Sequence, residues 1–239
     1  SSRNLRYSHA SELHGVQQGI YYLVEHTSIR HFKVKIMISR TASLASLTFL
    51  YLSIGSTNIS AASGVEGDFL HNVDQDIIND YSDLYNISSG DLDNYSEIDI
   101  TNSSDSSSAI VQYSPGIKAN NRAKIKQSGH SNSASINQVG RNNVAYINQD
   151  GSDNTAAIGQ IGGNSEALIS QDGNHNLAVI GQANFSGQGS QLSIDQKGNH
   201  NVAFMAGSGG DNLGISQDGH DFAIVNASSS MRIFINQAN

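Results

Sequence analysis

The chain lacks two residue types that stabilise many small domains. Among its 239 residues there is no cysteine and no tryptophan, and aromatic residues make up only 7%. Without cysteine, the chain has neither a disulfide framework nor a cysteine-based metal site. Glycine, serine, asparagine and glutamine abound instead, which is poor material for a conventional globular core. A disordered Gln/Asn-rich tract is therefore one alternative that the pattern of the sequence has to exclude.

Positive charge is also scarce. The formal net charge is -8, and the acidic residues gather between positions 63 and 108, where there is no lysine or arginine. This balance does not suggest a nucleic-acid partner. Charge of one sign among many serines and asparagines predicts a disordered, self-repelling acidic leader over 63–108. A segment recognised during export is the functional alternative for the same residues.

The longest apolar run, Leu44–Ile54, is well short of the roughly 20 residues that a membrane-spanning helix needs. Basic residues precede it, and the small residues Ser60-Ala61-Ala62 follow it. This order predicts a secretory signal peptide over 37–62, cleaved after Ala62. Residues 1–36 show no interpretable pattern, and Met37 is the first methionine, so we expect translation to begin there and 1–36 to be an upstream extension.

A short unit recurs between Ala123 and Gln237. It reads Ala-x-Ile-x-Gln-x-Gly-x-x-Asn, and the glutamines from Gln127 to Gln182 recur at a strict spacing of eleven residues. Three additional residues then shift the frame to Gln196. A fixed short period indicates a solenoid or a repeat array. It argues against disorder, because low-complexity tracts do not keep such a register.

The residues at the repeated positions form four sets. The glutamines are Gln127, Gln138, Gln149, Gln160, Gln171, Gln182, Gln196, Gln217 and Gln237. The isoleucines are Ile136, Ile147, Ile158, Ile169, Ile180 and Ile194. The asparagines are Asn132, Asn143, Asn154, Asn176 and Asn201. The turn glycines are Gly129, Gly140, Gly151, Gly162, Gly173, Gly198 and Gly219.

The spacing within the unit predicts a strand followed by a tight turn. In Asn-x-Ala-x-Ile-x-Gln, the strand period of two places all four named residues on one face. Glycine and asparagine in the turn tolerate left-handed backbone conformations. Two units then close a flat coil, and coils stack about 4.8 Å apart. The sequence therefore predicts an all-β, cross-β β-solenoid of about six coils over 109–239, with a degenerate first strand near Ala109.

The glutamines and asparagines would lie inside such a coil, where amides are costly unless they are hydrogen-bonded. Identical amides stacked on successive coils satisfy one another as a ladder, which is how cross-β assemblies bury them. A closed solenoid enzyme or an ice-binding solenoid is the alternative. Enzymes of that kind carry catalytic clusters, and no Ser/His/Asp, Cys/His or metal-spaced set recurs here, so no active site, metal or cofactor is expected.

The repeats resemble those of the curlins, the secreted functional-amyloid subunits of Gram-negative biofilms. Residues 190–203 read Ser-x-Leu-x-Ile-x-Gln-x-Gly-x-x-Asn-x-Ala, which matches the curlin unit at every fixed position. Residues 121–129, 144–149 and 230–237 are more similar to the minor, nucleating subunit than to the major one. Two features depart from that pattern, namely the long acidic leader and a final repeat with a single arginine, Arg232.

The resemblance implies a structural protein on the bacterial surface. Its implied partners are the major curlin subunit, an outer-membrane export pore with accessory assembly factors, and other copies of itself. The expected templating and anchoring edge is the last strand, Met231, Arg232, Ile233, Phe234 and Ile235. In that strand Met231, Ile233, Ile235 and Gln237 are expected to point inward. The major fibre subunit and an adhesin unrelated to curli remain as alternatives.

The outward positions predict two different faces, if the units are numbered from Gln127. Even-numbered units present an uncharged surface that includes Val179 and Phe204, whereas odd-numbered units present Lys124, Glu166 and Asp195. An exposed apolar face commonly marks a contact surface. Three turn histidines on consecutive coils are expected to stack about 5 Å apart, namely His175, His200 and His220.

Overall fold

The computed structural model describes residues 19–26, 29–39, 70, 73–87, 92–114 and 119–238. Its elements in chain order are β1 (Gly19–His26), β2 (Ile29–Ser39), α1 (Gln75–Tyr85), β3 (Leu92–Ser104), β4 (Ser106–Tyr113), β5 (Asn121–His130), β6 (Ser133–Arg141), β7 (Val144–Ser152), β8 (Thr155–Gly163), β9 (Ser165–Asn174), β10 (Leu177–Asn184), β11 (Ser190–Asn199), β12 (Val202–Ser208), β13 (Asn212–Asp218), β14 (Phe222–Asn226) and β15 (Arg232–Ala238).

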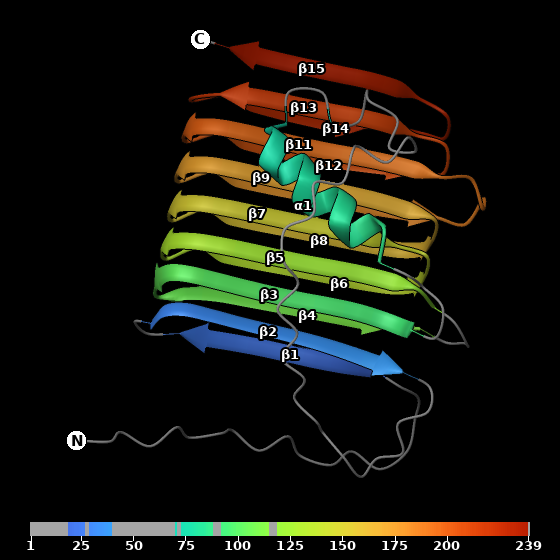
Figure 1. Ribbon diagram of the computed structural model, residues 1–239. Coiled ribbons are helices and arrows are strands. Elements are labelled where there is room, and N and C mark those ends of the chain that lie inside the picture. The colour runs from blue at the N-terminus through green and yellow to red at the C-terminus, as the bar shows by residue number, and fades with distance from the viewer. Residues whose placement is uncertain are drawn as a thin grey trace.

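The strands form a β-solenoid with two facing sheets (Figure 1). One sheet, here called the odd sheet, has the order β15-β13-β11-β9-β7-β5-β3-β2. The other, the even sheet, has the order β1-β4-β6-β8-β10-β12-β14. From β3 onward each strand pairs in parallel with the strand two places along the chain, in the register that aligns repeat with repeat. About six coils result, so the predicted fold class is confirmed.

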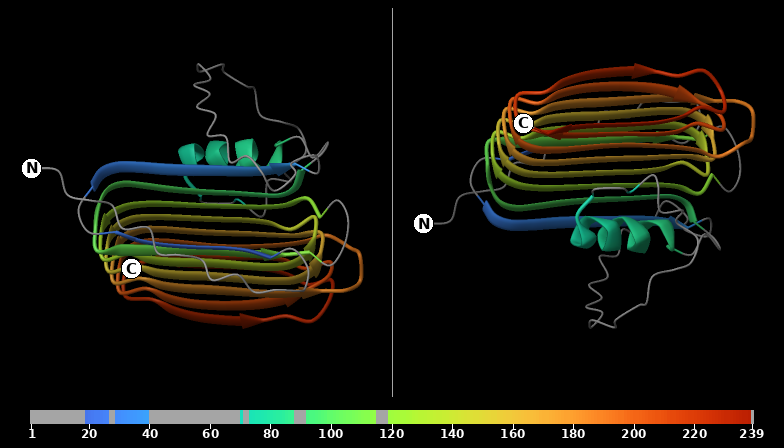
Figure 2. Two further views of the ribbon diagram at one scale, coloured as in Figure 1. Left: turned by 90° about the horizontal axis from the view of Figure 1, so that it is seen from below. Right: turned by 90° about the horizontal axis from the view of Figure 1, so that it is seen from above.

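The core between the sheets is built from the inward alanines and isoleucines of every coil. Ile147 and Ile169 on the odd sheet and Ile158 and Ile180 on the even sheet are 0–2% exposed. Viewed along the stack, the coil is flat, with the two sheets facing one another (Figure 2). A side-chain period of two on each strand explains this, because it sends every second residue into the narrow space between the sheets.

The solenoid begins earlier than the repeat pattern predicts. Its first coil is formed by β3 and β4, so the expected start near Ala109 is corrected to Leu92. Strand β3 aligns Ser96 with Ala123, Ile98 with Ile125 and Ile100 with Gln127. The repeat escaped recognition because serine and isoleucine replace the alanine and the glutamine that define the unit.

Part of the predicted disordered leader is therefore ordered chain, namely α1, β3 and the first residues of β4. Residues 63–69, 71–72 and 88–91 of that leader lie outside the described residues. Helix α1 forms because Ile77, Tyr81 and Leu84 recur at helical spacing, which gives it one apolar face. All three side chains are buried.

Two antiparallel strands cover the N-terminal edge of the stack. β1 pairs with β4, and β2 pairs with β3. Residues 1–36, in which no pattern was recognised, thus supply β1 and most of β2. The predicted signal peptide overlaps the end of β2 at residues 37–39, and from residue 40 to residue 62 it lies outside the described residues.

Helix α1 lies against the outer face of the odd sheet (Figures 1 and 2). Its buried residues join Val144, Tyr146 and Leu168 of β7 and β9 in a second hydrophobic cluster, outside the coil. Tyr146 and Leu168 are both 0% exposed. The outer face of the odd sheet is thus covered by apolar packing over these strands, whereas the sequence pattern predicted only a partly charged surface there.

Candidate functional site: the amide ladders and the C-terminal edge

The glutamines form two continuous ladders inside the coil. On the odd sheet, each amide nitrogen donates to the amide oxygen of the next coil, from Gln127 to Gln149 at 2.7 Å and from Gln149 to Gln171 at 2.8 Å. The same bond continues through Gln196 and Gln217 to Gln237. On the even sheet the ladder runs through Gln112, Gln138, Gln160 and Gln182. Stacking thus satisfies amides that would otherwise be buried without partners.

The second amide hydrogen of each glutamine links the two sheets. Gln149 Nε2 donates to the backbone oxygen of Ser133 at 3.1 Å, and Gln160 Nε2 donates to that of Val144 at 3.1 Å. A carbonyl oxygen accepts only, so this bond fixes which end of the side-chain amide faces the next coil. The link recurs along both ladders and was not predicted from the sequence, because the repeat pattern says nothing about contacts between facing strands.

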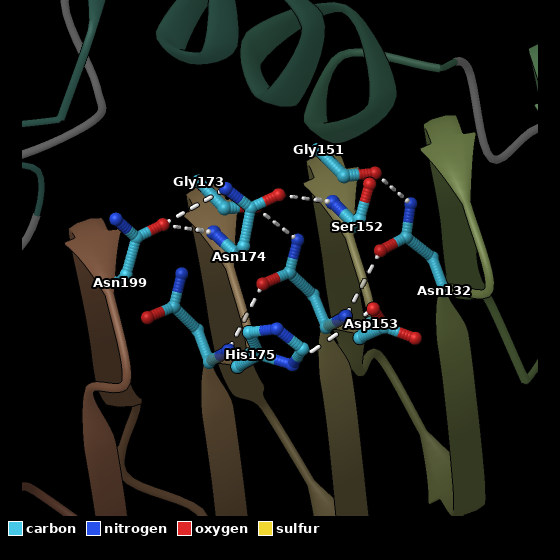
Figure 3. Close-up of polar contacts among 10 residues, drawn as sticks. Asn132, Gly151, Ser152, Asp153, Gly173, Asn174, His175 and Asn199 are labelled. Atoms are coloured by element: carbon cyan, nitrogen blue, oxygen red, sulfur yellow. Dashed lines mark hydrogen bonds and ion pairs between the residues drawn. The ribbon is translucent and has the colours of Figure 1, made fainter.

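The asparagines close the turns in an equally regular way (Figure 3). Asn132 Nδ2 donates to the oxygen of Gly151 in the next coil at 2.9 Å, and its Oδ1 accepts from the backbone nitrogen of Asn154 at 3.0 Å. Asn154 makes the same two bonds one coil further on, to Gly173 and Asn176. Each asparagine therefore sets the distance between one turn and the next.

Backbone conformation favours glycine at all seven turn positions, and lack of space also requires it at the first five, from Gly129 to Gly173. All seven predicted turn glycines have positive φ, for example +120° at Gly151 and +129° at Gly173. A side chain on Gly151 would collide with the carbonyl oxygen of Gly173, since the turns stack backbone against backbone. Only glycine combines this conformation with such a close approach.

The predicted ladder residues lie together in the core, with one exception at the end of the stack. Of the predicted glutamines, all but Gln237 are 0–3% exposed, and the predicted asparagines are 0–1% exposed. Gln237, on the last strand, is half-buried. The pattern missed Gln112 and Asn121, which occupy the same inner columns in the first two coils. Their repeats are otherwise degenerate.

The C-terminal edge is open among the residues that the structure describes. Strand β15 pairs there only with β13, and β14 pairs only with β12. Ile233 and Ile235 are partly buried against the core, as an inward position implies. Met231, which was also predicted to point inward, is 39% exposed because no further coil covers it in the described chain. Phe234 points outward, is 42% exposed and lies 6.0 Å from the guanidinium of Arg232.

Helix α1 is fastened to the odd sheet by charged and polar contacts as well as by apolar ones. Asp80 lies 3.4 Å from the Lys124 ammonium and 2.9 Å from that of Lys126, and the Tyr146 hydroxyl donates to it at 3.1 Å. Burial alone would raise the pKa of Asp80, but these three partners outweigh burial and lower the pKa.

The Tyr81 hydroxyl donates to Glu166 at 2.7 Å. Burial and this carboxylate raise the pKa of Tyr81 well above its usual value.

Asp195 is a buried acid on the outer face of the odd sheet. It was predicted to point outward, yet it is only 2% exposed. Burial raises its pKa to about 6, although the charge of Lys197 and a hydrogen bond from the Ser170 side chain lower the pKa in part. Lys197 itself pairs with Asp74, just before α1, at 2.8 Å. The acid therefore lies where the helix segment meets the sheet.

Three histidines stack on consecutive coils at one edge of the solenoid. The ring centroids of His175 and His200 are 5.0 Å apart, and those of His200 and His220 are 5.1 Å apart. His175 also lies 3.8 Å from Asp153 of the preceding coil. All four residues have positive φ and occupy the same place in successive turns.

These features define a class of protein, a parallel two-sheet solenoid with hydrogen-bonded amide ladders in its core, one from Gln127 to Gln237 and one from Gln112 to Gln182. Residues 119–151, 129–162 and 162–198 match the model of the curlin associated repeat. The matched residues make up about a third of the chain, so the chain contains curlin-associated repeats, and these support the curlin family. No curated protein and no solved structure matches the chain.

Repeat and fold together suggest a structural protein rather than an enzyme. Among the described residues there is no group of three or more His, Cys, Asp or Glu side chains that could hold a metal ion. In the part of the chain that the structure describes, no helix is long and apolar enough to cross a membrane.

Proposed function

We propose that the protein is the minor subunit of a curli-type fibre, secreted to the bacterial surface, where it nucleates polymerisation of a major curlin in biofilm formation and adhesion. The curlin-associated repeats support a structural subunit of curli fibres. The observation that carries the finer role is the C-terminal end of the stack, where β14 and β15 end the described strands uncovered.

An uncovered edge is a template. It presents backbone N–H and C=O groups that a further strand can pair with, and solenoids that stay monomeric usually cap such edges. Here the edge also presents the inner ladder, since Gln217 donates to Gln237 on the last strand at 3.0 Å. A subunit with the same repeat would therefore extend both the sheet and the amide ladder. Growth of the major curlin from this end is the consequence.

The outer side of the last strand suits a second task, retention at the cell surface. Arg232 and Phe234 are both exposed and adjacent, which gives this strand a basic and an aromatic contact group. The partners in this role are the outer-membrane export pore and its accessory assembly factors. The inner residues of this strand serve as the template for the next subunit, and its outer residues anchor the protein at the cell surface.

The test is seeding of a major curlin by a small amount of this protein. Full-length protein at a sub-stoichiometric ratio should abolish the lag phase of thioflavin fluorescence, whereas protein lacking residues 228–239 should fail to seed or be shed into the medium. A matched variant, Arg232→Ser with Phe234→Ser, should keep seeding but lose retention on cells. If the truncated protein seeds and stays on cells as well as the intact one, the last strand has neither role.

Two other functions remain to be separated from this one. If intact protein leaves the lag unchanged but polymerises readily alone, it is the major fibre subunit. If no second curlin and no export pore are encoded nearby, a surface adhesin outside the curli system is favoured instead.

A further inference from the structure

The even sheet carries an uncharged outer face over its C-terminal strands. The outward positions of β8, β10, β12 and β14 hold no ionisable side chain. Large apolar groups are exposed there, with Ile161 50%, Phe222 61% and Ile224 62% accessible. Apolar surface of this kind, gathered over neighbouring strands, marks a contact surface. A charged partner would find no complementary group on it.

The large and small residues on this face are ordered. Along β10 the outward residues are Leu177, Val179, Gly181 and Ala183, so two large side chains precede two small ones. Along β12 they are Val202, Phe204, Ala206 and Ser208, which repeats the same order. In β8 the order differs, because the small Ala157 aligns with Val179 and the large Ile161 aligns with Ala183. A ridge therefore runs over β10 and β12, a strip of small residues runs beside it on the same two strands, and Ile161 bounds that strip at β8.

The strip of small residues is a groove. A shallow cavity of about 420 Å³ lies over it, and its walls include Val139, Ile161, Ala183 and Ala206. The floor exists because Gly159 and Gly181 have no side chain, and a Cβ atom added at either would meet nothing within 4 Å. The structure therefore places a ridge and an empty groove side by side on the same strands.

We propose that this face binds a second copy of the chain, related by a two-fold axis that runs parallel to the stack, over the column Ile158, Ile180 and Met205. Such a rotation keeps the order of the coils and reverses the strand direction. Val179 of one copy then lies opposite Gly181 of the other, and Phe204 lies opposite Ala206. Each ridge enters the other copy's groove, as a two-fold interface requires. The two sheets pack about 10 Å apart as a dry zipper.

A second copy fits this face better than another occupant for two reasons. The order of large and small groups demands a partner with the reverse order, and the same strand rotated by 180° supplies it. In addition, α1 covers the opposite face over β5, β7 and β9. Among the described residues the even face is therefore the broader uncovered face, and pairing through it joins two stacks. The inference deepens the proposed fibre role and rests on it, because pairing becomes the way in which two stacks align with their growing ends together.

The decisive variant fills the groove without disturbing the fold. Gly181 points outward from a strand without positive φ, so Gly181→Leu should leave the monomer folded and improve its strand propensity. The bulk should abolish pairing of the full-length chain, measured as loss of dimer in sedimentation and as single rather than double filaments in electron micrographs. Gly181→Ala is the matched control and should still pair, since alanine already occupies the equivalent position 206.

The orientation is tested by cross-linking, because the chain has no cysteine of its own. Val179→Cys protein mixed with Gly181→Cys protein should be joined by a short bifunctional thiol reagent, which spans the roughly 10 Å between the sheets, much faster than either variant alone. The proposal is wrong if Gly181→Leu dimerises like the unmodified chain, or if Val179→Cys alone cross-links fastest, which would indicate a different rotation. Failure of the chain to seed a major curlin would overturn the nucleating role, whereas sedimentation would still decide the pairing.

Discussion

The two outer faces of the solenoid differ sharply although the strands beneath them share one repeat. Helix α1 packs on the odd face, where Tyr81 of the helix and Tyr146 and Leu168 of the strands are fully buried between them. The even face is bare, and Phe222 and Ile224 are more than half exposed. Inward residues must match from coil to coil because they stack on one another. Outward residues are free of that constraint, so the differences between faces are where partner specificity can evolve.

The largest effect is expected from substitutions in the glutamine ladder of the core, which lies beneath both faces. Gln149→Lys with Gln171→Lys would place two cations on consecutive coils in the core, where both glutamines are 0% exposed. Burying unpaired charge costs about 3 kcal/mol or more per site, so the coils should not fold and fibre assembly should be lost. Thioflavin kinetics and circular dichroism measure this. Ser135→Lys with Thr155→Lys, at exposed outward positions, is the control and should fold. Normal assembly of the glutamine variant would show that these side chains do not face inward.

A smaller loss, confined to one face, is expected from truncating the helix contact. Tyr81→Ala removes a fully buried ring and its hydroxyl bond to Glu166, which should destabilise docking of α1 by about 3 kcal/mol. Faster hydrogen exchange should appear in α1 while the inner strands stay protected. The matched change on the even face, Phe222→Ala, removes a ring that is 61% exposed and should cost less than about 1 kcal/mol. Equal losses would contradict the difference between the faces.

The odd face should also respond to pH through Asp195. Burial raises the pKa of this acid to about 6, above its value near 3.9 in unfolded chain, so the folded state favours the protonated form. The associated stabilisation is present in full below about pH 3.9 and is lost as the pH rises through 6, a change of roughly 1–3 kcal/mol. Lys197 opposes this shift, whereas Asp74 and Asp172 add to it.

Asp195→Asn isolates that contribution from the other acids. Denaturant midpoints of the two proteins, measured from pH 4 to 7, should converge at low pH and diverge in favour of the variant at pH 7. A difference that stays constant across this range would mean that Asp195 does not titrate there. Asp80 provides no such signal in this window, because its partners lower its pKa.

The smallest effect concerns the histidine stack at the edge between the two faces. Protonation of neighbouring imidazoles would place like charges on rings 5.0 and 5.1 Å apart, which would then repel one another. Since the groups are at the surface, the cost should stay below about 1 kcal/mol and be offset in part by Asp153 beside His175. Assembly should slow between pH 7.5 and 5, and replacing all three histidines with asparagine should remove that slowing. If the variant slows between pH 7.5 and 5 as much as the unmodified chain does, the histidine stack has no role in assembly.

The inner columns were predictable because stacking makes each coil constrain the next. Glutamine and asparagine at buried positions had to pair with their own kind, and glycine had to occupy turns with positive φ. Strand β3 escaped prediction where Ile100 replaces the expected glutamine. The docking of α1 escaped as well, because it joins residues 77–84 to strands some 60 to 90 positions later, and no local period encodes such a contact. The burial of Asp195, which was predicted only to point outward, escaped prediction for the same reason.

The ladders also give the stack an electrical direction. On the odd sheet, each ladder glutamine from Gln127 to Gln217 donates toward the C-terminal end, so the side-chain dipoles add along the axis instead of cancelling. Aligned hydrogen bonds in a chain polarise and strengthen one another. The C-terminal end of this ladder therefore offers an amide hydrogen, whereas the oxygen of Gln127 at its other end already accepts from the Ser108 hydroxyl. An arriving coil is bound well only if it presents its oxygens first, so the core itself distinguishes head-to-tail addition from the reverse before any outer surface makes contact.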